Sequence, residues 1–355
     1  MGEILGIGVT HHPGFLGPEE NLAYFLEATL RSERVPAHLK DPRNWPAPMQ
    51  AEWGADRGRT AAAEHRRRVV EGFRAVRRQL DAFRPDFVVI WGDDQYEQFT
   101  EECIPPFAVF ILDEFRVQPF QSVEYSPGER NAWGEPVDKL FCWRGHREGA
   151  SYLTQGLIEA GFDIAYAYRL RPGARPPHSF VNTLLYLDYD RSGFDYGVVP
   201  FHVNCYGSTV VRSRGGLGHL ESAEPGVRDP SAPPPWRCFE LGRATARILR
   251  DSPWRVALIA SSSWSHAFLT EKTGWIHPDI ESDQRLLRAL RAGEYTAFRD
   301  LTIAEAEAAG QHEIFNWVCL AGAMHELSYR PDYLEYVETY IFNSDKCLAT
   351  FGPAA

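Results

Sequence analysis

The sequence has no apolar run long enough to cross a membrane. Its purely apolar runs are short, as at residues 87–91, whereas a bilayer-spanning helix needs about 20 such residues. The N-terminus lacks a basic region followed by a long apolar stretch, so we expect no signal peptide. Basic residues are outnumbered, 37 against 48 acidic ones, and this balance argues against nucleic acid as a partner. We expect a protein that acts away from membranes and nucleic acids.

Paired cysteine motifs are also absent. The six cysteines are scattered and form no C-x-x-C pair. This pattern indicates the reduced thiols of a cytoplasmic protein rather than a disulfide framework or a cysteine-based zinc site. The chain does contain 44% apolar residues, enough for a sizeable core, and 12 histidines. Imidazole is the commonest metal ligand and the usual acid or base near neutral pH.

The order of the predicted elements indicates an α/β fold. Residues 4–9 and 87–91 are predicted as buried strands, and the helix between them, at about 60–83, repeats apolar residues every three or four positions. Strand, helix, strand predicts a parallel sheet with a right-handed crossover. The other strands are predicted at 107–112, 163–168, 196–204 and 254–261. The other helices are predicted at about 19–31, 147–160, 178–187, 235–251, 281–292, 303–309 and 313–324.

No internal repeat and no clean linker divides the chain. Residues of about 18–60 are rich in Pro, Arg and Asp, and residues 213–236 are rich in Ser, Gly and Pro. We therefore expect a single domain over residues 1–355, with a mostly parallel central sheet flanked by helices and insertions at these two places.

Polar side chains follow several of the predicted strands. Ligands of open α/β sheets bind beyond the carboxyl ends of the strands, so these residues are the first candidates for a site. A mixture of His and carboxylates there suits a metal site or acid/base chemistry, although a lone His is often a loop residue and Asp-Asp often caps a helix. The candidates are His11, His12, Asp93, Asp94, Gln95, His202, Asn204, Tyr206 and His266, followed by Glu281 and Asp283.

His65 is a further candidate on the predicted helix at 60–83. It precedes Val69 by four residues and Phe73 by eight, so it shares the helix face that packs on the sheet. The start of this helix should lie near the end of the first strand. His65 is therefore either a buried His bonded to the backbone or a metal ligand, and both interpretations stay open.

The order of these motifs resembles the catalytic subunits of class III extradiol ring-cleavage dioxygenases, of the protocatechuate 4,5-dioxygenase beta-subunit type. The resemblance implies that His11 and Glu281 bind Fe(II) and that His178 is the acid/base residue. The matching segments are His11-His12-Pro13, Leu16-Gly17, Pro85-Asp86, His178-Ser179-Phe180-Val181-Asn182, Pro200-Phe201-His202-Val203-Asn204, Ser265-His266, Glu281-Ser282-Asp283 and Phe342-Asn343-Ser344.

The sequence departs from the family pattern at one position. Where the family has its second iron-binding His, after the second strand, this chain has Gln95. An amide oxygen is a weak ligand for Fe(II) compared with imidazole. Three alternatives follow: His65 supplies the missing imidazole, which we prefer; Gln95 itself binds the metal; or the metal is weakly bound, different or absent.

The resemblance implies an Fe(II)-dependent oxygenase that cleaves a catechol-like or aminophenol-like aromatic with O2, with zinc or manganese as alternative metals. We expect His178 and His266 to be catalytic and His12, His202 and Tyr206 to contact the substrate. A homo-oligomer, with or without a small alpha subunit, is the expected assembly. The alternatives are a metal-assisted hydrolase or lyase on the same scaffold and a non-catalytic, ligand-binding member of the fold.

Overall fold

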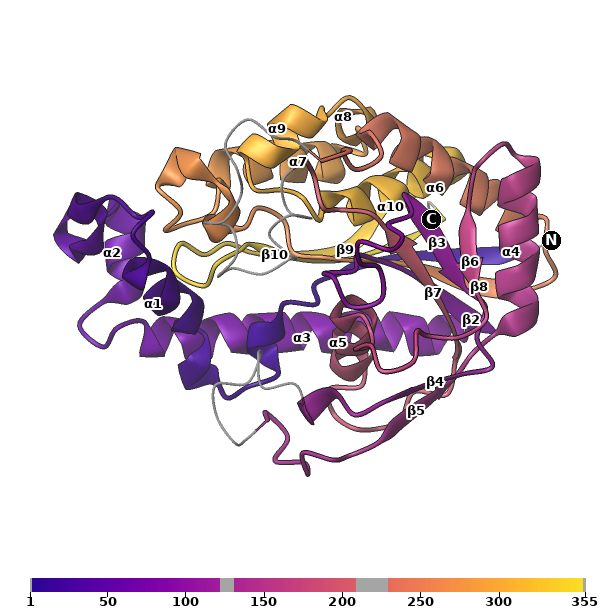
Figure 1. The fold of residues 1–355 in the computed structure, drawn as a ribbon, viewed down its shortest axis with the longest axis horizontal. Helices are drawn as coiled ribbons and strands as arrows, with labels where there is room; N and C mark the ends of the chain where they lie inside the picture. Colours follow the sequence, from indigo (N-terminus) through magenta and orange to yellow (C-terminus); the bar gives the residue numbers. More distant parts are fainter. Residues whose placement is uncertain (1, 122–130, 209–228, 354–355) are drawn as a thin grey trace.

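A large twisted sheet runs through the molecule (Figure 1). The computed structural model describes residues 2–121, 131–208 and 229–353. In this part of the chain eight strands form one sheet, in the order β6-β3-β7-β2-β8-β1-β10-β9, and β4 pairs with β5 beside it. The strands are β1 (Glu3–Val9), β2 (Phe87–Gly92), β3 (Phe107–Phe110), β4 (Glu114–Val117), β5 (Phe141–Arg144), β6 (Ala165–Ala167), β7 (Gly197–Val203), β8 (Arg255–Ser261), β9 (Arg330–Val337) and β10 (Lys346–Gly352).

The four central strands, β7, β2, β8 and β1, are parallel to one another. Their carboxyl ends therefore meet at one edge, where Val9 pairs with Ser261 and Trp91 pairs with Ala260. The strands β3 and β10 run antiparallel to their inner neighbours. The predicted α/β class with a mostly parallel sheet is confirmed.

Helices cover both faces of the sheet. The helices α3 and α5 lie on one face, and α4, α6 and α10 lie on the other (Figure 1). Each layer has its own cluster of buried apolar side chains against the sheet. The helices are α1 (Tyr24–Arg31), α2 (Ala47–Trp53), α3 (Arg59–Phe83), α4 (Arg147–Glu159), α5 (His178–Leu187), α6 (Pro235–Arg250), α7 (Ile280–Ala292), α8 (Thr296–Arg299), α9 (Ile303–Ala308) and α10 (Ile314–Leu327).

The helix α3 illustrates how the sequence pattern determines the fold. Its apolar positions Val69, Phe73 and Val76 are buried against the sheet, as their spacing predicts. It begins after Gly58, whose φ of 82° suits glycine, and ends at Phe83, before Arg84, whose φ of 51° is also left-handed. None of the described helices is both long and apolar enough to cross a membrane.

The predicted insertion at about 18–60 contains α1 and α2, which lie together at one end of the molecule (Figure 1). Its Pro-rich sequence predicted only one short helix. The helix α2 is attached to the C-terminal part of the chain because the Glu52 carboxylate accepts hydrogen bonds from Thr339 Oγ1, Tyr340 N and Ile341 N. Most of the second predicted insertion, residues 213–228, lies outside the described residues.

Candidate metal centre

His11 lies just beyond β1, at the carboxyl edge of the parallel strands. Its side chain is buried, and its Nδ1 lies 3.0 Å from the carbonyl oxygen of Ser261, at the end of the adjacent strand β8. The Asn182 amide donates to the His11 backbone carbonyl at 3.0 Å. The strand β8 therefore holds the imidazole of His11, and the helix α5 holds its backbone.

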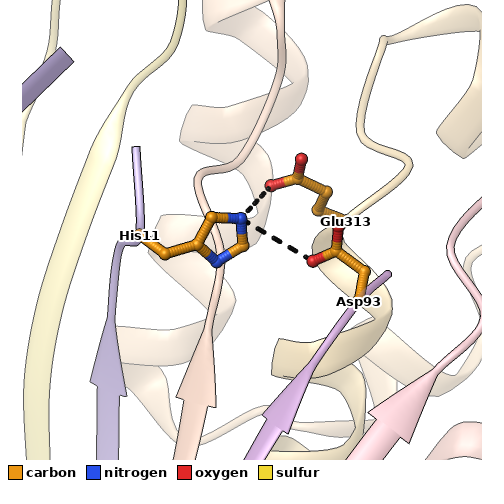
Figure 2. Close-up of side chains that lie close together, drawn as sticks. All are labelled: His11, Asp93 and Glu313. Carbon is orange, nitrogen blue, oxygen red and sulfur yellow. Dashed lines mark ion pairs between the residues drawn. The ribbon is translucent and has the colours of Figure 1, made fainter. Parts of the chain in front are cut away.

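Two carboxylates face the other ring nitrogen of His11. Nε2 lies 3.7 Å from Asp93 Oδ1 and 3.4 Å from Glu313 Oε2 (Figure 2). Asp93 follows β2, and Glu313 directly precedes α10. All three side chains are buried, and one ligand atom from each lies within 4.8 Å of the other two. We call His11, Asp93 and Glu313 the central triad.

The hydrogen bonding of His11 determines what the central triad can hold. A carbonyl oxygen only accepts, so the 3.0 Å contact with Ser261 O favours a proton on Nδ1, although the Ser261 hydroxyl, 3.2 Å from the same nitrogen, can donate to it in the other tautomer. In the neutral tautomer with the proton on Nδ1, the lone pair of Nε2 faces two carboxylates, which is unfavourable away from water. A cation between these atoms, either a proton or a metal ion, removes the repulsion. Donation of the second N–H to a carbonyl is also the usual arrangement of a metal-binding His.

The pKa values of the two carboxyl groups move in opposite directions, because burial and the neighbouring charges act differently on each group. Burial, reinforced by the charge of Glu313, raises the pKa of Asp93 to about 6. Burial also acts to raise the pKa of Glu313, but the neighbouring His266 and His11 outweigh it and lower this pKa to about 2. Such a donor set of one imidazole and two carboxylates fits a divalent ion of the first transition row.

Amide side chains hold the carboxylates in place. Gln95 Nε2 donates to Glu313 Oε1 at 2.9 Å and, at 3.4 Å, to Asp93 Oδ2. Asn316 Nδ2, one turn into α10, donates to Asp93 Oδ1 at 3.2 Å and to the carbonyl of Ser261 at 3.2 Å. Gln95, the position at which the sequence departs from the family pattern, therefore lies beside the central triad.

His178 stands next to the central triad at the start of α5. Its ring centroid lies 5.0 Å from that of His11, edge to face. Glu97 Oε1 accepts hydrogen bonds from both the backbone N and Nδ1 of His178, each at 3.0 Å. Burial acts to lower the pKa of His178, but the charge of Glu97 and its hydrogen bond raise it to about 9. His178 is therefore a proton-bearing group beside the candidate centre.

His65 faces the sheet but lies outside the central triad. Its ring stacks on Phe15 at 6.0 Å and contacts Phe342 at 5.0 Å. Burial, with the charge of Lys346, lowers its pKa well below the ordinary value of 6.5. The face predicted for His65 is the observed one, but the imidazole is surrounded by aromatic rings. We preferred the alternative in which His65 supplies the second imidazole. Among the described residues, no contact between His65 and His11 supports it.

Glu281, which the family resemblance assigned to the metal, is not one of the residues of the central triad. It is an exposed residue in the first turn of α7, whereas the carboxylate that faces His11 belongs to Glu313. The buried carboxylate of that helix is Asp283, which accepts hydrogen bonds from the backbone N of Ser265 and from Gln311 Nε2. Asp283 therefore fixes the loop that carries His266, and Glu281 points to solvent.

The remaining predicted residues are all buried. His266 Nε2 lies 3.6 Å from Glu313 Oε1. The Tyr206 hydroxyl donates to Asp94 Oδ1 at 2.9 Å. His202 is fully buried within β7 and packs against Phe99. The Nδ1 atom of His12 accepts the backbone N–H of Gly14 at 3.1 Å.

Sequence reasoning missed the roles of Glu313 and Glu97. A Glu before a helix is ordinarily attributed to the helix dipole, and Glu313 follows no strand. One signal was available, because the residues after Glu313 are mostly apolar on every side of the predicted helix, and the structure buries all of them from Ile314 to Met324. A Glu at the start of such a helix is carried into the interior.

Comparisons with known proteins point to one family. Residues 228–343 match the family model of the catalytic LigB subunit of aromatic ring-opening dioxygenase. The predicted resemblance to class III extradiol dioxygenases is confirmed. The matched region includes Glu313 and His266, whereas His11 and Asp93 precede it.

Three curated relatives carry the name of one activity. A 2,3-dihydroxyphenylpropionate/2,3-dihydroxicinnamic acid 1,2-dioxygenase 2 of Pseudomonas putida is 25% identical over 203 residues, which are 56% of this chain and 49% of that protein. The 1,2-dioxygenase of Photorhabdus laumondii is 21% identical over 73% of this chain and 71% of its own length. That of Comamonas testosteroni is 24% identical over 70% and 63%. The match thus spans between 49% and 71% of the length of these three relatives.

Proposed function

We propose that this chain is an extradiol-type, metal-dependent ring-cleavage dioxygenase that acts on a catechol-like or aminophenol-like aromatic. The observation that supports it best is the position of the buried His11 Nε2, 3.7 Å from Asp93 Oδ1 and 3.4 Å from Glu313 Oε2. The names of the three relatives support the choice of an aromatic diol and O2.

The metal we propose is Fe(II), held by His11, Asp93 and Glu313 rather than by two His and one carboxylate. When bound there, Fe(II) supplies the Lewis acidity and redox chemistry for a reaction between an aromatic and O2. Two carboxylates leave a neutral centre with a divalent ion, so the cationic His178 becomes the main positive charge available to an ionised ring hydroxyl.

The protein groups then have separate tasks. His178, held by Glu97 at 3.0 Å, exchanges a proton with the ring hydroxyl, because it is the charged imidazole nearest to His11. Gln95 and Asn316 hold the two carboxylates. We propose that His266, 3.6 Å from Glu313, borders the substrate side of the site. Assembly as a homo-oligomer, with or without a small subunit, and a cytoplasmic location remain predictions.

Oxygen consumption tests this function against a metal-assisted hydrolase or lyase. The protein is loaded anaerobically with Fe(II) and mixed with catechols and 2-aminophenols, and O2 uptake is followed together with loss of the aromatic absorbance. We expect one O2 per aromatic consumed and both atoms of 18O2 in the product. Turnover that continues without O2 would contradict the proposal, as would the absence of turnover on every such aromatic.

A further inference from the structure

A groove of about 590 Å3 lies away from the central triad, between the loop that follows β2 and the segment that follows β6. Its lining includes Phe99 and Phe110 from one side and Ala167 and Leu170 from the other. No residue of the central triad lines it. Its volume is within the range of about 300–1,000 Å3 typical of small-molecule sites.

The groove combines this apolar lining with two arginines. Arg169 is exposed and has no hydrogen-bond or ion-pair partner among the residues for which the structure gives positions. Arg171 donates to Thr100 Oγ1 at 2.6 Å and lies 3.5 Å from a carboxylate oxygen of the exposed Glu102. An exposed pair of this kind is weak, so a positive charge remains available at the groove.

We propose that this groove binds a small organic anion with an apolar ring or chain and a carboxylate or sulfonate group. The apolar part packs between Phe99 and Leu170, and the anionic group pairs with Arg169. The charge of Arg169 selects against neutral molecules of the same shape. Binding of this anion does not require the proposed ring-cleavage activity.

The position of the groove relates it to the candidate centre. Asp94 accepts the backbone N–H groups of Glu97, Gln98 and Phe99 and so holds them in one tight turn. Glu97 on this turn holds His178, while Phe99 on the same turn lines the groove. An anion in the groove therefore contacts the same turn that orients His178.

The probe for this site is 8-anilinonaphthalene-1-sulfonate, whose fluorescence is titrated against the metal-free full-length protein. N-phenyl-1-naphthylamine, the uncharged analogue, is the matched ligand control. We expect one sulfonate bound per chain. Binding should be at least about tenfold weaker in Ala167→Trp, because the Trp side chain fills the groove. Binding should be several-fold weaker in Arg169→Gln, because the charge that pairs with the sulfonate is lost. Binding of the uncharged analogue should not respond to Arg169→Gln.

Two control variants complete the test. Arg250→Gln removes an exposed arginine of α6 and should leave the affinity unchanged, and His11→Gln should also leave it unchanged, because the groove is separate from the central triad. Circular dichroism verifies that Ala167→Trp folds. If it does not fold, Arg169→Gln still tests the site, because this exposed residue can be changed without disturbing the core. Absence of binding, or binding unaffected by both groove variants, would overturn the proposal.

Discussion

The side-chain amide of Gln95 donates a hydrogen bond to Glu313 Oε1 at 2.9 Å. An amide nitrogen is a donor only, so Gln95 presents its NH2 group, and not its oxygen, to the carboxylates of the central triad. The alternative in which Gln95 binds the metal requires the opposite orientation. The observed contact makes Gln95 a residue that orients Glu313 and, more weakly, Asp93.

Replacing Gln95 by Leu tests this positioning role. Gln95→Leu keeps most of the side-chain volume but removes the donor, so Glu313 is no longer held and the two carboxylates repel each other without a bridging amide. We expect metal affinity, measured by anaerobic calorimetric titration, to fall about 10- to 100-fold, as for other partners of metal ligands. Gln155→Leu is the matched control, because Gln155 donates to Glu159 at 2.7 Å on an exposed helix face. Equal affinities in the two variants would exclude the role.

The pKa of His178 depends on Glu97. In Glu97→Gln the side chain keeps its shape but loses its charge, so the pKa of His178 should fall from about 9 by about one to three pH units. Titration of the His178 ring protons by NMR in the metal-free protein measures the change. Because the folded pKa lies above the ordinary 6.5, the stabilisation from this pair is complete below pH 6.5 and is lost as the pH rises through 9. A pKa unaltered by Glu97→Gln would refute this dependence.

His202 makes the fold sensitive to acid. Burial lowers its pKa from 6.5 to about 4, so between these values the unfolded chain binds a proton that the folded chain does not. The free energy of unfolding is unaffected by His202 above pH 6.5 and decreases as the pH falls toward 4, by about 3 kcal/mol in total. Urea unfolding at several pH values should show a shallower decrease in His202→Gln. An identical pH dependence in both proteins would argue against this assignment.

Glu52 attaches the N-terminal insertion to the rest of the chain. In Glu52→Ala, the N–H groups of Tyr340 and Ile341 lose their acceptor, and α2 loses its polar contacts with this segment. We expect a loss of about 1–3 kcal/mol in stability and faster tryptic cleavage near Arg43. Glu20→Ala, an exposed change in the same insertion, is the control. Cleavage at the rate of the control variant would show that this attachment is unimportant.

Much of the fold could be predicted from the sequence because its strands and helices have strong local patterns. The run 87–91 lies in β2, and the three- and four-residue spacing of Val69, Phe73 and Val76 defines α3. The strands β4, β5, β9 and β10 were missed. In β9, which lies at the sheet edge, burial follows no strict alternation, and β10 is buried as a continuous run, so neither shows a half-buried strand pattern.

The candidate site could be predicted only in part for a related reason. Residues that follow parallel strands converge at a common edge, so His11 and Asp93 could be placed together without knowledge of any contact. Glu313 reaches the same point from a helix at the far end of the sequence. Only tertiary packing of α10 brings it there, whereas the resemblance to the family assigned the carboxylate ligand to Glu281.

The account depends most on the assignment of the metal to His11, Asp93 and Glu313. The direct test is anaerobic titration of the metal-free protein with Fe(II), comparing Glu313→Gln with the matched exposed variant Glu281→Gln. We predict one ion per chain in the wild type and in Glu281→Gln, and an affinity at least about 100-fold lower in Glu313→Gln, because a ligand rather than its supporting partner is lost. Unchanged affinity in Glu313→Gln, or loss of binding in Glu281→Gln, would contradict the account.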